Sequence, residues 1–155
     1  MEYVKRDLEE ELWDYMESPE ILAVTGPRQA GKTTLFKKLQ EQLDNSKYIT
    51  FEDRDVLRLF EEDEKEFAEL HLEDNDYLLI DEFQYAEDGG KKLKYLYDAY
   101  PDKKILITGS SAADMTIEGL KHLTGRVLKF NLYPFSFREF LRCKDIGLYK
   151  IFEKR

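Results

Sequence analysis

The sequence of 155 residues contains one cysteine, Cys143, and only two histidines, His71 and His122. A lone cysteine excludes an internal disulfide, and two histidines this far apart lack the clustered pattern of a zinc site. We therefore expect both histidines to be surface or helix-face residues rather than metal ligands.

Long apolar runs are also missing. No window of about 18 uninterrupted apolar residues could form a membrane-spanning helix, and residues 1–7 lack the apolar stretch of a secretory signal. The chain is 42% hydrophobic and 37% charged, which is typical of a folded domain with a heavily solvated surface. We expect a cytoplasmic protein without membrane contacts, whose residues 1–155 form a single domain around one core.

Positive charge is scarce, because the formal net charge is −9, and this argues against uniform binding to a nucleic-acid backbone. The charge is unevenly distributed. Residues 52–76 carry twelve acids and three bases, whereas residues 121–155 carry nine bases and three acids. The acidic stretch is typical of a solvated helix face. The basic stretch could dock a protein partner, nucleic acid or another part of the protein.

The sequence is rich in signals for a phosphate-binding loop. Residues 26–33 read Gly-Pro-Arg-Gln-Ala-Gly-Lys-Thr and fit the P-loop pattern G-x-x-x-x-G-K-[ST], directly after the apolar residues 21–24. In such a loop the backbone N–H groups face inward at the mouth of a helix, where they bind phosphate. The residues predicted to contact the nucleotide are Gly26, Pro27, Arg28, Gln29, Ala30, Gly31, Lys32, Thr33 and Thr34.

Two of these residues have specific predicted roles. Lys32 would meet the β- and γ-phosphates, and the hydroxyl of Thr33 would bind Mg²⁺, which takes few protein oxygens beside those of the nucleotide. Leu35, Phe36 and Leu39 recur at helical spacing behind the loop, so the loop leads from a strand into a helix.

A second motif, Leu-Leu-Ile-Asp-Glu, places two carboxylates at the end of an apolar strand, where open α/β sheets bind ligands. This is the Walker B arrangement. Asp81 would hold Mg²⁺, and Glu82 could take a proton from the water that attacks the γ-phosphate. Small-molecule kinases do not need such a base. GTPases need an Asn/Thr-Lys-x-Asp element that this sequence lacks, so ATP is the expected nucleotide.

Other polar residues have more than one interpretation. Ser110, in Thr-Gly-Ser-Ser at the end of the next strand, is either a sensor of the γ-phosphate or a helix cap. Gln84 could position water or lie on a surface helix. Arg126 is a candidate for neutralising charge on the transferred phosphoryl group, within the chain or across a subunit boundary.

Hydrophobic patterning indicates an α/β protein in which strands alternate with helices, and therefore a mainly parallel sheet. Val4, Leu8, Leu12 and Tyr15 predict an N-terminal helix that packs across the sheet edge or the nucleotide base. Predicted strands are residues 21–25, 48–51, 77–80, 105–108 and 127–132, and further helices are predicted after residue 33, over 56–70, around 93–100 and from Ser136.

With Ile-Thr-Gly-Ser-Ser, Leu-Thr-Gly-Arg and Leu-Tyr-Pro-Phe-Ser-Phe-Arg-Glu-Phe-Leu, these motifs resemble those of prokaryotic AAA+-like ATPases over residues 3–141. The resemblance implies a three-layer P-loop NTPase fold with strand order 5-1-4-3-2, flanked by helices. It also implies that residues 26–33 bind the phosphates of ATP, Asp81 binds Mg²⁺, Glu82 is the catalytic base, residues 108–111 form the sensor region and Arg126 is a motif residue.

The sequence departs from that family in two respects. Ser110 replaces the usual sensor asparagine, and members of the family usually continue into C-terminal domains, which we expect this chain to lack. An apolar surface is then expected near the C-terminus, formed by Phe135, Phe137, Phe140, Leu141, Ile146, Leu148, Tyr149, Ile151 and Phe152. The sequence therefore predicts an ATPase that hydrolyses ATP slowly alone and moves an attached domain or partner; a non-hydrolysing nucleotide switch and, less favoured, a small-molecule kinase are the alternatives.

Overall fold

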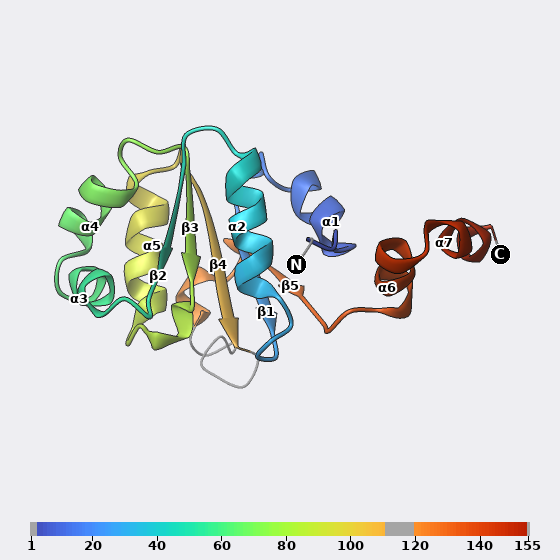
Figure 1. The fold of residues 1–155 in the computed structure, drawn as a ribbon. Helices are drawn as coiled ribbons and strands as arrows, with labels where there is room; N and C mark the ends of the chain where they lie inside the picture. Colours follow the sequence, from blue (N-terminus) through green and yellow to red (C-terminus); the bar gives the residue numbers. More distant parts are fainter. Residues whose placement is uncertain (1–2, 111–119, 155) are drawn as a thin grey trace.

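The computed structural model describes residues 3–110 and 120–154, and its central feature is an all-parallel sheet of five strands. The strand order is β2-β3-β4-β1-β5 (Figure 1). This is the predicted order 5-1-4-3-2 counted from the other edge, so that prediction is confirmed. The strands are β1 (Ile21–Gly26), β2 (Ser46–Thr50), β3 (Tyr77–Asp81), β4 (Lys104–Ser110) and β5 (Val127–Asn131).

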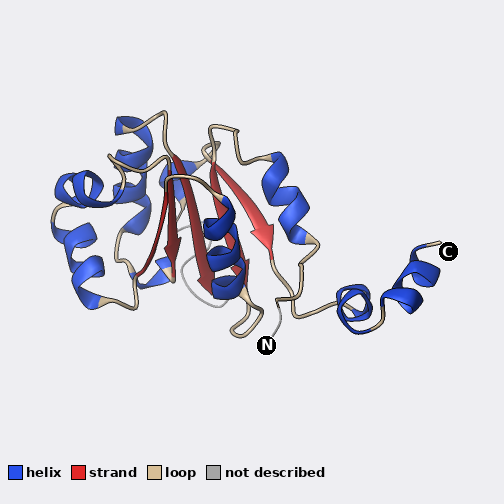
Figure 2. Cartoon of the chain, turned by 45° about the horizontal axis from the view of Figure 1, so that its top comes forward, coloured by secondary structure: helices blue, strands red, loops and turns tan. Residues whose placement is uncertain are grey.

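Helices cover both faces of the sheet, which is why the central strands are apolar at almost every position. Side chains alternate between the faces. In β1, Ile21 and Ala23 join one apolar cluster, whereas Leu22 and Val24 join the other. The first cluster includes side chains of α3 (Arg54–Glu62), α4 (Glu64–His71) and α5 (Gly89–Ala99), and the second includes side chains of α1 (Leu8–Asp14) and α2 (Lys32–Gln42). The predicted three-layer α/β fold is confirmed, as Figure 2 shows with its helices on either side of the strands.

The segment over residues 56–70 is helical as predicted, except at Asp63, which divides it into two helices, α3 and α4. Asp63 leaves the helical conformation at φ −151° and caps α4 by accepting a hydrogen bond from the Glu66 N–H at 3.0 Å. The break lets Phe60 and Phe67 both pack against Phe51 in the core. Burial of aromatic surface therefore outweighs helix continuity here.

The N-terminal helix is shorter than predicted. α1 begins at Leu8 rather than Val4, and Tyr15 follows its last residue. Leu12 and Met16 are buried on the same face of the sheet as α2. The segment lies against this face beside the edge strand β5, with the ring centroid of Tyr15 5.8 Å from that of Phe130. Of the two predicted positions, the structure therefore supports the sheet edge.

The two histidines differ in environment. His122 is exposed, but the α4 residue His71 is only 6% exposed, and its ring centroid lies 4.8 Å from that of Phe67. Burial is the main reason that the pKa of His71 falls to about 4, with a smaller contribution from Lys47. His71 therefore lies on the buried face of its helix, and His122 lies at the surface, so each histidine takes one of the two predicted places.

The C-terminal helices α6 (Phe137–Lys144) and α7 (Ile146–Glu153), hereafter the arm, lie beyond β5 and away from the layered body (Figures 1 and 2). Ser136 and Glu139 form a capping box that starts α6 at its predicted position. Leu141 is buried, but most of the predicted apolar surface is exposed. Its exposed members are Phe135, Phe137, Phe140, Ile146, Leu148, Ile151 and Phe152.

Other helices in the described ranges are the short 3-10 turns η1 (Phe83–Tyr85) and η2 (Lys121–Leu123). None of the helices in residues 3–110 and 120–154 has the length and apolar character needed to cross a membrane.

Candidate nucleotide-binding site

Residues 26–33, hereafter the phosphate loop, connect the carboxyl end of β1 to the first turn of α2. Gly26 has no room for a side chain, because a Cβ would lie 2.2 Å from the carbonyl oxygen of Leu132. Gln29 and Gly31 adopt positive φ values of 66° and 99°. The second conformation is one that glycine adopts readily, so the two motif glycines allow the turn that the sequence predicted.

Lys32 folds back over the loop. Its Nζ donates hydrogen bonds to the carbonyl oxygens of Gly26 and Pro27, each at 2.8 Å. Burial lowers the pKa of Lys32, while the nearby carboxylates of Glu82 and Asp81 act in the opposite direction. The ammonium group is thus held at the mouth of the loop by contacts that an anionic ligand could replace.

Asp81 is 1% exposed and lies at the end of β3, beside the phosphate loop. Its Oδ2 accepts hydrogen bonds from the hydroxyls of Thr33 and Tyr48, both at 2.6 Å. Its Oδ1 accepts a hydrogen bond from the hydroxyl of Thr108 in β4. Burial and the bond to Asp81 raise the pKa of Tyr48, which keeps this donor protonated.

A hydroxyl and a carboxylate that adjoin in this way are hard oxygen donors and fit Mg²⁺, whose remaining ligands come from water and phosphate. Within the described ranges there is no group of three or more His, Cys, Asp and Glu side chains that could hold a metal ion. Thr33 and Asp81 are thus a partial ligand set, suited to a cation that arrives with a nucleotide.

Glu82 follows Asp81 with a left-handed backbone, at φ 58° and ψ 44°, a conformation that costs free energy for a residue other than glycine. Its N–H donates to the Thr108 hydroxyl at 3.0 Å. The Gln84 side chain donates to Glu82 Oε2 at 2.6 Å and accepts from the Ser110 N–H at 3.4 Å. These bonds link the ends of β3 and β4 and orient the Glu82 carboxylate.

A pocket of about 480 Å³ joins these elements, and its size lies in the usual range for small-molecule sites, about 300–1,000 Å³. The structure thus brings together six of the predicted loop residues with Glu82 and Ser110, whereas Gly26, Pro27 and Ala30 do not line the pocket. It adds Glu52 and Tyr85, which the sequence did not indicate. The pocket is lined by Arg28, Gln29, Gly31, Lys32, Thr33, Thr34, Glu52, Glu82, Tyr85 and Ser110. Ser111, which shared the predicted sensor region, lies outside the described residues.

Arg126 does not join this pocket. It precedes β5, and its carbonyl oxygen accepts a hydrogen bond from the Ile21 N–H at the amino end of β1, whereas the phosphate loop follows the carboxyl end of that strand. With a rise of about 3.3 Å per residue, the strand separates the two by roughly 16 Å. Arg126 instead lies 3.9 Å from a carboxylate oxygen of Asp98. This position does not support the predicted role within the same chain.

Sequence patterns did not reveal the role of Arg6, which is 3% exposed beneath the loop. Its Nη1 donates to the carbonyl oxygen of Ala30 at 2.5 Å, and its Nε donates to Glu139 Oε2 at 2.9 Å. The helix that contains Glu139 was predicted to start at Ser136, but nothing in the sequence pairs Glu139 with a residue 133 positions away.

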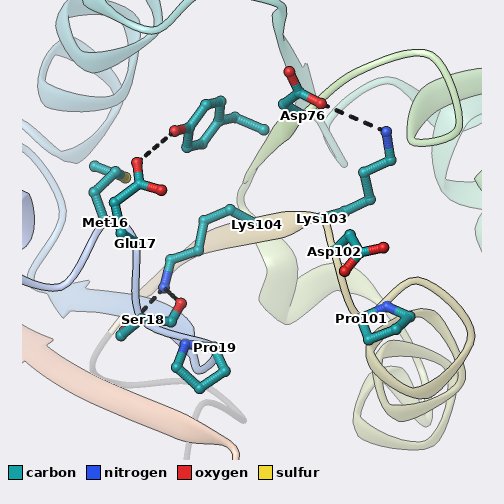
Figure 3. A pocket seen from close by; sticks show the side chains of 10 residues that line it. Met16, Glu17, Ser18, Pro19, Asp76, Pro101, Asp102, Lys103 and Lys104 are labelled. Carbon is teal, nitrogen blue, oxygen red and sulfur yellow. Dashed lines mark hydrogen bonds and ion pairs between the residues drawn. The ribbon is translucent and has the colours of Figure 1, made fainter.

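A second pocket lies at the amino ends of the strands, opposite the phosphate loop (Figure 3). It is formed by residues that precede β1, β3 and β4 or begin these strands, including Ser18, Asp76 and Lys104. The Lys104 Nζ donates to backbone oxygens of Tyr15, Ser18 and Glu20 at 2.6–2.9 Å. This lysine fixes the chain between α1 and β1, and none of the predicted site residues lies in this pocket.

The fold and the site define a P-loop nucleotide-binding domain: a parallel α/β sheet with the phosphate loop after β1 and two acidic residues at the end of β3. The family model described as an AAA domain matches residues 18–141. The chain belongs to this family of P-loop, AAA+-like domains.

The curated relatives are longer proteins. The chain is 29% identical to an uncharacterized protein of Haemophilus influenzae over 88% of its own length and 37% of that protein. It is 31% identical to an uncharacterized protein of Methanocaldococcus jannaschii over 84% of its own length and 30% of that protein. It therefore spans about a third of the length of these relatives.

Solved structures share the fold. Domain III of the Thermotoga maritima replication initiation protein DnaA superposes with a TM-score of 0.61 at 19% identity, over 92% of this chain and 72% of that one. A structure of Pif1 helicases that unwind forked DNA gives a TM-score of 0.56 at 16% identity, over 88% of this chain and 45% of that one. Identities this low establish a common fold only.

Proposed function

We propose that this domain binds ATP together with Mg²⁺ and hydrolyses it to ADP and phosphate, slowly when alone, to drive or switch an attached domain or a partner. The observation that carries the proposal is one pocket of suitable size lined by the phosphate loop and Glu82, with Asp81 hydrogen-bonded to the lining residue Thr33. Family membership supports nucleotide binding by an ATPase-like domain.

In this proposal the loop N–H groups bind the phosphates, and Lys32 exchanges its bonds to Gly26 and Pro27 for the β- and γ-phosphate oxygens. Thr33 and Asp81 would hold Mg²⁺ at their adjoining oxygens. When bound, the cation would neutralise charge on the phosphates.

Glu82 is the proposed general base. Its carboxylate lines the pocket, and the hydrogen bond from Gln84 holds it in place beside the loop. Ser110 is the proposed sensor, since its N–H reaches Gln84 and through it Glu82. Loss of the γ-phosphate would therefore change the positions of residues at the ends of both β3 and β4.

Arg126 keeps only one of its two proposed roles. Because Arg126 lies far from the loop of its own chain, we keep only the role across a subunit boundary. In that role its half-exposed side chain would contact the nucleotide bound to a second copy of the chain. That role requires self-association.

Three candidates are proposed for what ATP hydrolysis drives. The greater length of the relatives supports an attached domain, and the exposed apolar arm supports docking of a protein partner or a second copy. Nucleic acid is a further candidate because of the nine bases in residues 121–155. Two solved structures that share the fold involve DNA, one of a DnaA replication initiator bound to single-stranded DNA and one of Pif1 helicases that unwind forked DNA, and at 12% and 16% identity they share only the fold with this chain.

The test is phosphate release from ATP by wild type, Glu82→Gln and the exposed control Glu87→Gln. Loss of a general base lowers turnover by about 100-fold or more. Glu82→Gln should therefore bind ATP without releasing phosphate, and Glu87→Gln should match wild type. Equal turnover in both variants would refute the role of Glu82.

The same assay separates the alternatives. A nucleotide switch without hydrolysis would bind ATP and release no phosphate even as wild type. A small-molecule kinase would transfer the phosphoryl group to an added acceptor instead of releasing it to water.

A further inference from the structure

Arg6 connects the phosphate loop to the arm through a buried set of bonds. Besides Ala30 and Glu139, its guanidinium donates to the carbonyl oxygen of Tyr133 and lies 4.4 Å from the centroid of the Phe135 ring. Arg6 and Glu139 are 3% and 5% exposed. One planar side chain thus contacts the loop, the segment after β5 and α6 at once.

We propose that Arg6 couples anion binding at the phosphate loop to the position of the arm, so that nucleotide occupancy is transmitted to the exposed apolar surface of α6 and α7. This inference rests on the proposed function, because it takes the phosphates of ATP as the anion. Arg6 is a positioning residue in this scheme and does not touch the nucleotide.

The peptide between Ala30 and Gly31 carries the first step. In a trans peptide the C=O and N–H groups point in opposite directions. Arg6 holds the Ala30 carbonyl oxygen at 2.5 Å, so the Gly31 N–H points away from Arg6. Gly31 lines the pocket, where this N–H is available to an anion. A cation on the carbonyl also polarises this N–H, which strengthens its bond to an anion.

Glu139 carries the second step. Its Oε2 accepts from Arg6 and from the Asp7 N–H at 3.0 Å, and its Oε1 accepts from the Ser136 N–H at 2.8 Å. Burial, the largest influence, raises the pKa of Glu139, but together the bonds from Ser136, Arg6 and Asp7 hold it below its ordinary value. The buried pair is therefore charged at neutral pH, and it anchors the first turn of α6.

Coupling follows from this geometry. An anion on the Gly31 N–H and the guanidinium on the Ala30 carbonyl act on the same rigid peptide, so a shift of the loop displaces Arg6. Arg6 cannot move without changing its bonds to Glu139 and Tyr133, which position α6. Coupling is reciprocal, so a change at the arm end must alter the affinity for ATP.

The chain carries its own probe, because Cys143 is exposed on α6 and is the only cysteine. An environment-sensitive dye on Cys143 reports on the arm, and calorimetry on the same labelled protein reports ATP binding with Mg²⁺. The test variant is Arg6→Lys, which keeps the positive charge beside Glu139. Its single side-chain nitrogen cannot replace the three guanidinium nitrogens, each of which donates to a different acceptor. The matched control is Arg58→Lys on an exposed position of α3.

We expect ATP to change the dye emission of wild type and Arg58→Lys, and Arg6→Lys to lose most of this change. The affinity of Arg6→Lys for ATP should fall about fivefold or more, the lower end of typical coupling between sites. Glu139→Gln, which keeps an oxygen for the Ser136 N–H, tests the arm end separately if Arg6→Lys fails to fold by circular dichroism, and it should show the same two losses.

Three results would overturn the inference. ATP that binds wild type without a change in emission would refute the coupling and leave the proposed function intact. A full emission change with unaltered affinity in a folded Arg6→Lys or Glu139→Gln variant would refute the role of the pair. No ATP binding by folded wild type would contradict both the inference and the proposed function.

Discussion

Replacing Lys32 by alanine should have little effect on stability without nucleotide and a large effect on ATP binding. In the unliganded chain Lys32 makes two hydrogen bonds to loop carbonyls, but its lowered pKa shows that burial disfavours its charge. Loss of these bonds and relief of the buried charge offset one another, so we expect the free energy of unfolding to change by less than about 1 kcal/mol.

ATP binding should respond much more strongly. A hydrogen bond to a charged group contributes about 1.5–3 kcal/mol, so Lys32→Ala should weaken ATP binding about 10- to 150-fold. At an ATP concentration 100 times the wild-type Kd, binding stabilises wild type by about 2.7 kcal/mol. At about 2–4 °C per kcal/mol for a chain of this size, this raises Tm by roughly 5–11 °C.

A variant with about 30-fold weaker affinity gains only about 0.9 kcal/mol at the same concentration, or roughly 2–3 °C. Differential scanning fluorimetry with and without ATP and Mg²⁺ measures both quantities. The control is Lys91→Ala, an exposed lysine on α5. The reasoning is refuted if Lys32→Ala keeps the full wild-type shift, or if it unfolds several degrees below wild type without nucleotide.

Three further outcomes are expected. His71 binds a proton in the unfolded chain below pH 6.5 but in the folded chain only near pH 4. Its contribution to stability is therefore present above pH 6.5 and falls as the pH drops. Between pH 7 and 5 the free energy of unfolding of wild type, measured in urea, should fall by up to about 2 kcal/mol more than that of His71→Leu. Tyr48→Phe removes one of three hydroxyl donors to Asp81, and the free energy of unfolding should fall by about 1.5 kcal/mol in the same assay. Arg126→Ala breaks a half-exposed pair with Asp98, so the free energy of unfolding should change by less than about 1 kcal/mol and ATP affinity should be unchanged. A loss of ATP turnover that grows with protein concentration would favour action between subunits. A loss independent of concentration would contradict the placement of Arg126 away from the loop of its own chain.

Much of the fold could be predicted because its signals are local. The phosphate loop is a contiguous pattern, and short apolar runs identified every strand of the sheet to within two residues at either end. The alternation of strands with helices, together with the family resemblance, then gave the order that the structure confirms.

The differences from prediction arise where contacts between residues distant in sequence determine the local structure or the burial of a side chain. Asp63 breaks a continuous helical pattern so that Phe60 and Phe67 can reach Phe51. His71 looked like any helix-face residue, and only the packing of α4 buries it. Arg6 gave no signal, because its partner Glu139 is 133 residues away.

The candidate site shows the same division. Thr33 and Asp81 were predicted from separate motifs, and the structure brings them to 2.6 Å. The third partner, Tyr48, lies in β2 without a motif of its own, and its contact with Asp81 depends on the pairing of β2 with β3. Arg126 belongs to a recognisable motif, but its place in the chain did not reveal that β1 separates it from the loop.

Calorimetric titration of the folded chain with ATP, ADP and GTP in the presence of Mg²⁺ tests the central claim most directly. The phosphate loop, the Thr33 and Asp81 oxygens and the absence of a guanine-reading motif predict saturable binding of ATP and weaker binding of GTP. No binding of any of the three nucleotides, or a preference for GTP, would contradict the account.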